Sequence, residues 1–222
     1  MGELENFVAT DPPKWGVMDL FYWKMVPDRF GGGIQYIQKY KDAWVKHHKE
    51  QIKDEAYMND FPPELLAGIC WIEVGGDPHF IDRLAFGVRA FDYSGPNWVD
   101  ENLTMTNRPS KTSFGAVSMQ LATAAHTLGL DVNTMTYSQL RDLSHSLGKD
   151  RYNISLVAKH IVEIMERDNL PQDSDFFSMD DVKIVGARYN RGLGLSIERI
   201  RLNTSYGDFI VKHWDRFVGL LV

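Results

Sequence analysis

Apolar side chains recur at spacings of three and four residues along most of the chain, which is the pattern of amphipathic helices. Between residues 34 and 45 they mark one helical face, at Ile34, Ile37, Tyr40, Trp44 and Val45. The pattern continues toward Met58, with lysines and glutamates between the apolar positions. We therefore predict an amphipathic helix over this stretch. Residues 1–30, which are rich in aromatic side chains and prolines, are expected to be irregular.

A second helix is predicted between Asp60 and Gly75. Asp60 can cap its first turn, where Pro62 and Pro63 are tolerated. The helix is almost entirely apolar until Glu73, and the glycines that follow are the usual helix terminators. Glu73 is thus expected at the last position of a buried helix.

The remainder of the chain also shows helical spacing, except for one stretch. Between 77 and 112, alternating apolar positions predict a short strand or hairpin followed by an irregular loop. Further helices are predicted over 117–128, after a capping box of Thr136 and Gln139, from a cap at Asn153 to about Asp168, from Ser178 to Asn190, and over about 205–219. The fold class is therefore mainly α, of the α+β kind.

Composition and charge exclude several classes of protein. Apolar residues make up 44% of the 222 residues and charged residues 24%, as in soluble globular proteins. A formal net charge of −6 argues against a nucleic-acid partner. No run of about 18 apolar residues exists, so no membrane span is predicted. The single cysteine, Cys70, permits no intrachain disulfide, and its apolar surroundings indicate a buried side chain rather than a nucleophile.

Glu73 is the acid whose position indicates chemistry. The negative end of the helix dipole and the apolar neighbours both disfavour a charged carboxylate there, so its pKa should be raised. A carboxylic acid that is protonated near neutral pH can protonate the leaving oxygen of a glycosidic bond. The alternative is an exposed glutamate in a last helical turn, without a special role.

Two later segments carry polar side chains beside small residues. In Ser113–Gln120, Gly115 and Ala116 would let a ligand approach the backbone, and Gln120 can both donate and accept hydrogen bonds. In Gly186–Gly192, Tyr189 and Asn190 lie at a predicted helix end, where side chains can project into a cleft. Each segment alone also fits an ordinary turn or helix cap.

Four segments in this order resemble the lytic transglycosylases of glycoside hydrolase family 23, a branch of the lysozyme superfamily. The matching stretches are Leu65–Glu73, Ser113–Gly129, Asn153–Ile164 and Gly186–Gly192. The resemblance implies a lysozyme-like catalytic domain at 60–222 with an insertion at 75–112. Residues 1–59 would form an N-terminal helical extension.

The resemblance also implies roles for single residues. Glu73 would protonate the glycosidic oxygen after N-acetylmuramic acid and then act as a base, on the sugar's own 6-hydroxyl or on water. Tyr189 would stand beside Glu73 as a further catalytic residue. The residues that would bind the sugar are Ser113, Gly115, Met119, Gln120 and Asn190. The implied substrate is the glycan strand of peptidoglycan, and no metal or organic cofactor is expected.

The chain departs from the family pattern in three places. Val74 follows Glu73, where the family usually has serine. The family's Gly-Leu-Met-Gln motif corresponds to Val117-Ser118-Met119-Gln120 and is one residue shorter here. About forty residues separate Glu73 from Ser113. The acids of this insertion leave hydrolysis open. Asp92 is the candidate second acid of a muramidase, which would hold the attacking water.

Other interpretations stay open at the level of the sequence. The chain could be a glycan-binding protein that keeps the fold without catalysis, or an enzyme with chitinase-type activity. The N-terminus shows no secretory signal. An enzyme acting in the periplasm or cell wall would then be exported by a non-classical route, as a toxin or phage-type lysin, or be a fragment of a larger protein. A toxin would have an inhibitor protein as its partner.

Overall fold

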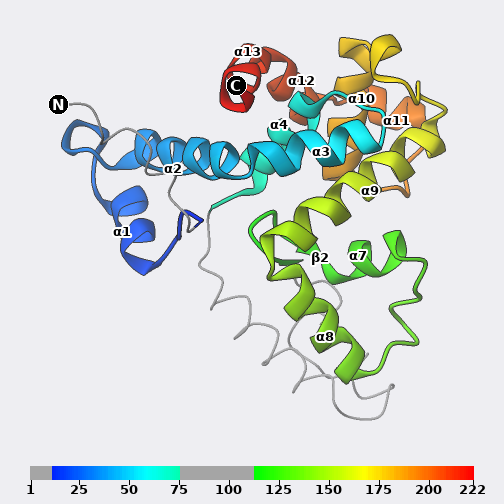
Figure 1. Cartoon of the computed structure of the whole chain (residues 1–222), viewed down its shortest axis with the longest axis horizontal. Coiled ribbons are helices and arrows are strands. Elements are labelled where there is room, and N and C mark those ends of the chain that lie inside the picture. Colours follow the sequence, from blue (N-terminus) through cyan, green and yellow to red (C-terminus); the bar gives the residue numbers. More distant parts are fainter. Residues whose placement is uncertain (1–11, 76–112) are drawn as a thin grey trace.

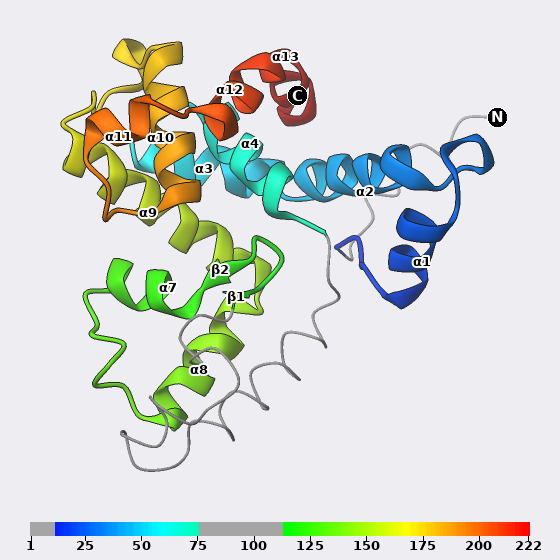
Figure 2. The same cartoon turned by 180° about the vertical axis from the view of Figure 1, so that it is seen from behind.

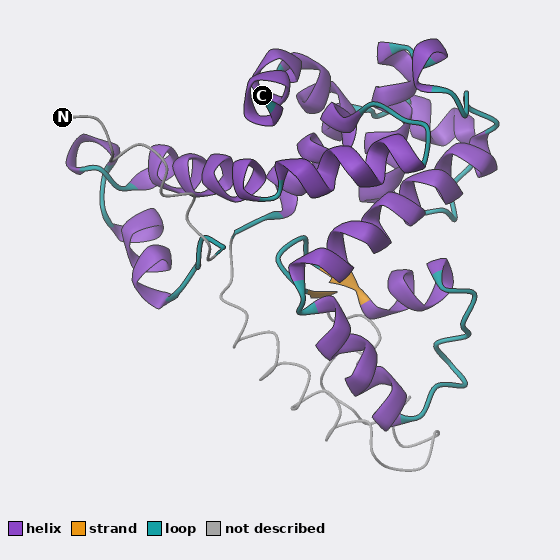
Figure 3. Cartoon of the chain, in the orientation of Figure 1, coloured by secondary structure: helices purple, strands orange, loops and turns teal. Residues whose placement is uncertain are grey.

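The computed structural model describes residues 12–75 and 113–222. These residues form many helices and one two-stranded antiparallel sheet (Figures 1 and 3). The mainly α class predicted from the apolar spacing is therefore confirmed. The strand or hairpin predicted within 77–112 lies outside the described residues.

The N-terminal part contains α1 (Val17–Met25), the 3-10 turn η1 (Asp28–Phe30), α2 (Gly33–His47) and α3 (Lys49–Met58). The predicted helix over 34–58 is confirmed, with a break at His48, which ends α2 and begins α3. The expectation that residues 1–30 are irregular is wrong for α1. This helix is held against α2 by aromatic contacts. Tyr22 stacks on Tyr36, and Trp23 contacts Trp15, whose ring centre lies 4.6 Å from that of Tyr40.

Helix α4 (Pro63–Glu73) runs through the centre of the molecule, in contact with α2, α3, α9, α10, α12 and α13. Its buried side follows from an almost unbroken apolar sequence between Leu65 and Trp71. The N-cap is Pro62 rather than Asp60, because Asp60 adopts a left-handed backbone conformation outside the helix. The predicted C-terminal end at Glu73 is confirmed.

A short hairpin precedes the helices of the second half. Strands β1 (Ser113–Phe114) and β2 (Met119–Gln120) pair Ser113 with Gln120 and Phe114 with Met119. The helix predicted from 117 therefore begins only at α7 (Leu121–Thr127). Gly115 has a φ of +81°, a value that favours glycine in the turn. Helix α8 (Tyr137–Leu147) starts with the predicted capping box of Thr136 and Gln139.

Helix α9 (Asp150–Asp168) connects the two ends of the molecule. It packs against α3, α7, α8 and α10 (Figure 1). Gln51 of α3 donates to the carbonyl oxygen of Arg151 near the start of α9, and Thr127 of α7 contacts His160 farther along the helix. The helix begins three residues before the predicted cap, so Asn153 lies inside it rather than at its start.

The C-terminal part contains η3 (Ser174–Phe176), α10 (Met179–Arg191), α11 (Ile197–Arg201), α12 (Ser205–Lys212) and α13 (Trp214–Leu221). The predicted cap at Ser178 is confirmed by its hydrogen bond from the Asp181 amide. The predicted last helix is two helices, separated at His213. Arg188 donates two hydrogen bonds to buried Asp168 and thereby ties α10 to α9.

One hydrophobic core unites most of these elements. Trp44 and Ile52, from α2 and α3, belong to the same buried cluster as residues of α4, α9 and α13. The boundary at 59/60 thus crosses a shared core, and its meaning as a domain boundary stays a prediction. Within residues 12–75 and 113–222, no helix combines the length and the hydrophobicity that crossing a bilayer requires.

Candidate active site

Glu73 lies at the C-terminal end of α4 and is partly buried. The next residue, Val74, is fully buried in extended conformation, and Gly75 turns the chain away with a φ of +83°. The carboxylate is therefore held at the edge of the core, at the point where the chain leaves α4. The apolar helix predicted this position correctly.

Tyr206 of α12 holds the Glu73 side chain. Its hydroxyl donates a hydrogen bond of 2.7 Å to Glu73 Oε1. Burial, followed by the nearby charge of Glu73, raises the pKa of Tyr206 well above its usual value, so the phenol stays protonated as a donor. The bond occupies one carboxyl oxygen and leaves Oε2 for another partner.

Lys41 of α2 is the cation that acts on Glu73. Its ammonium donates to the carbonyl oxygens of Trp71 and Ile72, at 2.8 and 2.6 Å, and so satisfies the C-terminal end of α4. Burial lowers the pKa of Lys41 to about 8, against a smaller opposing influence of Glu73. The charge of Lys41 at the C-terminal end of α4 therefore lowers the pKa of Glu73.

The pKa of Glu73 is raised above its usual value. Burial is the largest cause, and it outweighs the hydrogen bond from Tyr206 and the charge of Lys41, which both lower the pKa. The direction predicted from the sequence is therefore confirmed, with burial as its main cause. Such a carboxyl group can donate a proton at higher pH than an ordinary glutamate.

Tyr189 of α10 stands beside this pair. Its ring centre lies 6.2 Å from that of Tyr206 and 5.8 Å from that of His160, in α9. Burial, and then the charge of Glu73, raise its pKa well above the usual value. Tyr189 is partly exposed. The influence of the Glu73 charge on its pKa places the two residues in the same site.

The ring of His160 packs against the ring of Tyr189 in a T-shaped contact. It is almost fully buried, and its Nδ1 lies 2.9 Å from Glu163 Oε2 and 3.0 Å from Thr127 Oγ1. Burial lowers the pKa of His160. The imidazole is thereby fixed by α7 and α9 partners, and its ring edge limits where Tyr189 can lie.

Two glycines bring the tyrosines to Glu73. Gly186 of α10 and Gly207 of α12 face each other so closely that a Cβ on Gly186 would lie 2.7 Å from the Cα of Gly207. Tyr206 directly precedes Gly207, and Tyr189 follows Gly186 by three residues. The close crossing of the two helices therefore sets the position of both hydroxyl groups.

The predicted sugar-binding residues of 113–120 lie on the hairpin. Gln120 is exposed and Ser113 is partly exposed, while Met119 is 3% exposed and belongs to the core. Gly115 is buried, and a Cβ there would lie 2.2 Å from the carbonyl oxygen of Leu147. Gln120 is thus the side chain of this block that is most open to a ligand, and the binding roles of all four stay predictions.

Asn153 has a role that the sequence did not indicate. From inside α9, its Oδ1 accepts a hydrogen bond of 2.9 Å from the backbone amide of Val117. The side chain is fully buried beneath Gly115. Asn153 therefore holds the turn of the hairpin in place rather than capping a helix.

The remaining predicted site residues are less closely placed. Asn190 is exposed in the last turn of α10, next to Tyr189, and its part in binding stays a prediction. Asp92 lies outside the described residues. Among residues 12–75 and 113–222, no group of three or more His, Cys, Asp or Glu side chains has the arrangement of a metal site.

The site thus joins Glu73 and Tyr189, as predicted, with two residues that sequence reasoning missed. A signal for Lys41 was present, because it falls on the apolar face of its helix between Ile37 and Trp44. Tyr206 likewise falls on the apolar face of the predicted last helix. Its burial could have been expected from that spacing, but its partner could not.

Comparisons with models of protein families, with curated proteins and with solved structures found no match.

Proposed function

We propose that this protein cleaves the β-1,4 glycosidic bond between N-acetylmuramic acid and N-acetylglucosamine in peptidoglycan, with Glu73 as general acid and then base. The observation that carries the proposal is the partly buried carboxyl of Glu73, whose pKa is raised and whose Oε1 accepts from Tyr206. Two further observations support the proposal: the order of the four sequence motifs, and a mainly α fold that is compatible with a lysozyme-like domain. The expected place of action is the periplasm or the cell wall.

The first step needs a proton on the free oxygen of Glu73. With Oε1 engaged by Tyr206, the proton resides on Oε2 and passes to the glycosidic oxygen as the bond to the sugar's anomeric carbon breaks. Glu73 is then ionised, and the Tyr206 hydrogen bond and the Lys41 charge stabilise that form. Tyr206 and Lys41 thus act in the second step, in which Glu73 must be a base.

For the second step we propose the reaction of a lytic transglycosylase, because the four sequence motifs resemble that family. A single acid suffices when the 6-hydroxyl of the muramic acid attacks its own anomeric carbon, since Glu73 receives the hydroxyl proton and a 1,6-anhydro sugar forms. Tyr189 would orient the N-acetyl group of the substrate during this attack.

Digestion of purified peptidoglycan tests the proposal. Mass spectrometry of the released muropeptides should show 1,6-anhydro products with the wild-type protein, and Glu73→Gln should reduce them by about a thousandfold or more, because the amide cannot supply a proton. Glu64→Gln is the matched control, since Glu64 lies in the first turn of the same helix, α4. It should retain wild-type activity.

Each other outcome has a definite meaning. Muropeptides with reducing ends would contradict the transglycosylase reaction and assign a muramidase, for which Asp92→Asn is the next variant. Equal activity of wild type and Glu73→Gln would refute Glu73 as the acid. Absence of products with folded wild-type protein would refute cleavage of this substrate.

A further inference from the structure

Exposed apolar side chains gather at one end of the molecule. Of the sixteen large hydrophobic residues that are exposed in the described part of the chain, seven lie between 17 and 34. Their exposed fractions range from 41% to 69%, and they are Val17, Met18, Phe21, Tyr22, Met25, Phe30 and Ile34. We call residues 14–39 the N-terminal arm. It extends away from the helical body (Figures 1 and 2).

The apolar side chains on α1 form one continuous face. Successive residues of a helix are rotated by about 100°, so the five exposed positions of α1 fall within an arc of about 140°. The opposite side carries Leu20 and Trp23, and the Trp23 ring contacts Trp15, which packs on α2. The inner face therefore holds α1 in place. At one edge of the outer face, Tyr22 stacks on Tyr36 of α2, with 5.4 Å between the ring centres. The other four residues, Val17, Met18, Phe21 and Met25, make the face larger than a scattered set of surface apolar groups.

The charges around this face are positive. Four basic side chains of the arm are exposed: Lys14, Lys24, Arg29 and Lys39. Its two acids are engaged within the arm, because Asp19 accepts from Tyr36 Oη at 2.6 Å and Asp28 accepts from the Gln35 amide at 3.3 Å. Four basic and two acidic residues give the arm a formal charge of +2, on a chain whose net charge is −6.

The cations border the apolar face directly. Lys24 projects over the ring of Trp23 at 3.6 Å, and Arg29 lies over the ring of Phe30 at 4.9 Å. On the helix, Lys24 falls next to Val17, at the edge of the apolar arc. An apolar face bordered by lysine and arginine is the composition of helices that lie in the surface of an anionic membrane.

We propose that the N-terminal arm docks on an anionic phospholipid surface. The α1 face enters the boundary between headgroups and acyl chains, while Lys14, Lys24, Arg29 and Lys39 contact lipid phosphates. The body remains in water, because its negative charge is repelled by the same surface. This association is peripheral and does not involve a membrane span. It does not depend on the proposed activity.

Flotation with lipid vesicles tests the arm. The purified protein should float with vesicles of equal parts phosphatidylglycerol and phosphatidylcholine, and only weakly with phosphatidylcholine alone. Added salt should reduce the bound fraction. The double variant Phe21→Glu, Met25→Glu should lower binding by about tenfold or more, since two apolar anchors become anionic.

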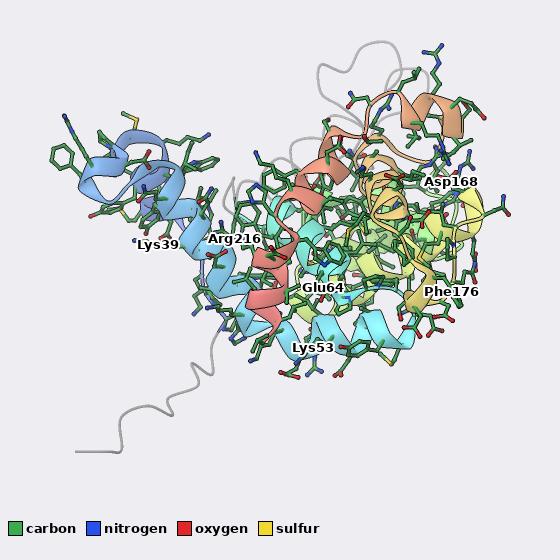
Figure 4. The ribbon with its side chains drawn as sticks, turned by 90° about the horizontal axis from the view of Figure 1, so that it is seen from above. Lys39, Lys53, Glu64, Asp168, Phe176 and Arg216 are labelled. Carbon is green, nitrogen blue, oxygen red and sulfur yellow. The ribbon has the colours of Figure 1, made fainter. Side chains whose placement is uncertain are left out.

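The matched control is the double variant Phe176→Glu, Met179→Glu, whose side chains are also exposed but lie at the opposite end of the molecule from Lys39, as Figure 4 shows for Phe176. It should bind vesicles like wild type. Circular dichroism should show both double variants folded. Equal binding by both, or none by wild type, would overturn the proposal. A wild-type dimer in lipid-free buffer that Phe21→Glu, Met25→Glu dissociates would instead assign the face to a second copy of the chain.

Discussion

At the scale of single residues, the proposed reaction places two opposite requirements on the pKa of Glu73. A general acid needs a raised pKa to keep its proton, whereas the base that forms after proton transfer needs its charge stabilised. Burial raises the pKa, while the hydrogen bond from Tyr206 and the charge of Lys41 stabilise the ionised carboxylate. Because the pKa is raised in spite of these two groups, one side chain could serve in both proposed steps.

Replacing Tyr206 by phenylalanine should reveal its share of this balance. Tyr206→Phe removes a hydrogen bond that lowers the pKa of Glu73, so that pKa should rise further. Glu73 then stays protonated to higher pH, and the alkaline limb of the pH–rate profile should move to higher pH. The maximal rate should fall by about tenfold or more, because the carboxyl loses its fixed orientation. Muropeptide release measured across pH checks both effects.

Tyr57→Phe is the control for this variant, because Tyr57 is 62% exposed on α3. Its profile should match that of wild type. An alkaline limb that stays in place, or moves to lower pH, in Tyr206→Phe would contradict the role given to the hydrogen bond.

Residue identity alone predicted part of the site. Glu73 was found because an isolated acid at the end of an apolar helix is conspicuous in the sequence. Tyr206 was not found, because its bond to Glu73 spans 133 positions and leaves no local pattern. Asn153 was misplaced for a related reason, since asparagine favours helix starts in general, while its actual partner is the distant amide of Val117.

At the scale of the elements, the crossing of α10 and α12 governs the geometry of the site. Gly207 approaches α10 so closely that a Cβ there would lie 2.3 Å from the Lys183 carbonyl oxygen. Backbone atoms cannot move aside as a flexible side chain can. A larger residue at this point must separate the two helices and carry Tyr206 away from Glu73.

Gly207→Ala should therefore reduce activity as well as stability. We expect a loss of about 2 kcal/mol or more in the free energy of unfolding, from the clash with the α10 backbone. Activity at a temperature where the variant is folded should fall in the same direction as in Tyr206→Phe. Urea denaturation and muropeptide release measure the two quantities.

Gly219→Ala is the matched substitution, since Gly219 is also helical but no atom lies within 4 Å of its added Cβ. It should stabilise the protein by about 0.5–1 kcal/mol, because alanine favours a helix over glycine. If Gly207→Ala were as well tolerated as this control, the close crossing would not be what positions Tyr206.

Elements with local signals were the ones that the sequence predicted well. The capping box at Thr136 and the helix start at Ser178 depend on neighbours three residues away, and both predictions were confirmed. The hairpin at 113–120 was missed, because its turn depends on the left-handed Gly115 and on the support of Asn153 from another helix. Helix α1 was missed because it is held by contacts with α2, such as the stacking of Tyr22 on Tyr36, which leave no pattern in the local sequence.

At the scale of the whole molecule, α2 connects the arm to α4, the helix that carries Glu73. Lys41 contacts the carbonyl end of α4, and Asp42 accepts hydrogen bonds from Trp71 of α4 and Arg216 of α13. Three helices from distant parts of the sequence thereby meet at two adjacent residues. The mainly α class could be predicted from apolar spacing, but this junction could not, because it consists of polar contacts between elements.

The buried ammonium of Lys41 should make stability depend on pH. Its pKa is lowered from 10.5 to about 8, so between these values the unfolded chain binds a proton that the folded chain has released. The contribution of Lys41 to the free energy of unfolding should therefore rise with pH across this window, by about 3 kcal/mol at most. The buried Cys70 thiol, whose pKa is raised, contributes with the opposite sign, so the effect of Lys41 is measured as the difference between wild type and Lys41→Met. That difference should change with pH in favour of wild type.

Denaturation with urea at a series of pH values from below 8 to above 10 measures this effect. Lys39→Met, on an exposed position of the same helix, should keep the pH dependence of wild type. A Lys41→Met profile parallel to that of wild type would show that Lys41 is not desolvated as described.

The same helix also sets a distance. Ile34 of the N-terminal arm and Lys41, which contacts the C-terminal end of α4, lie on one uninterrupted helix, and seven residues correspond to about 10 Å along its axis. With the arm bound to a lipid surface, the rigid helix α2 would keep Glu73, and the bond that it cleaves, at a fixed distance from that surface. The proposed enzyme would then select which layer of the wall it cuts by the length of a helix, independently of how tightly it binds the sugar.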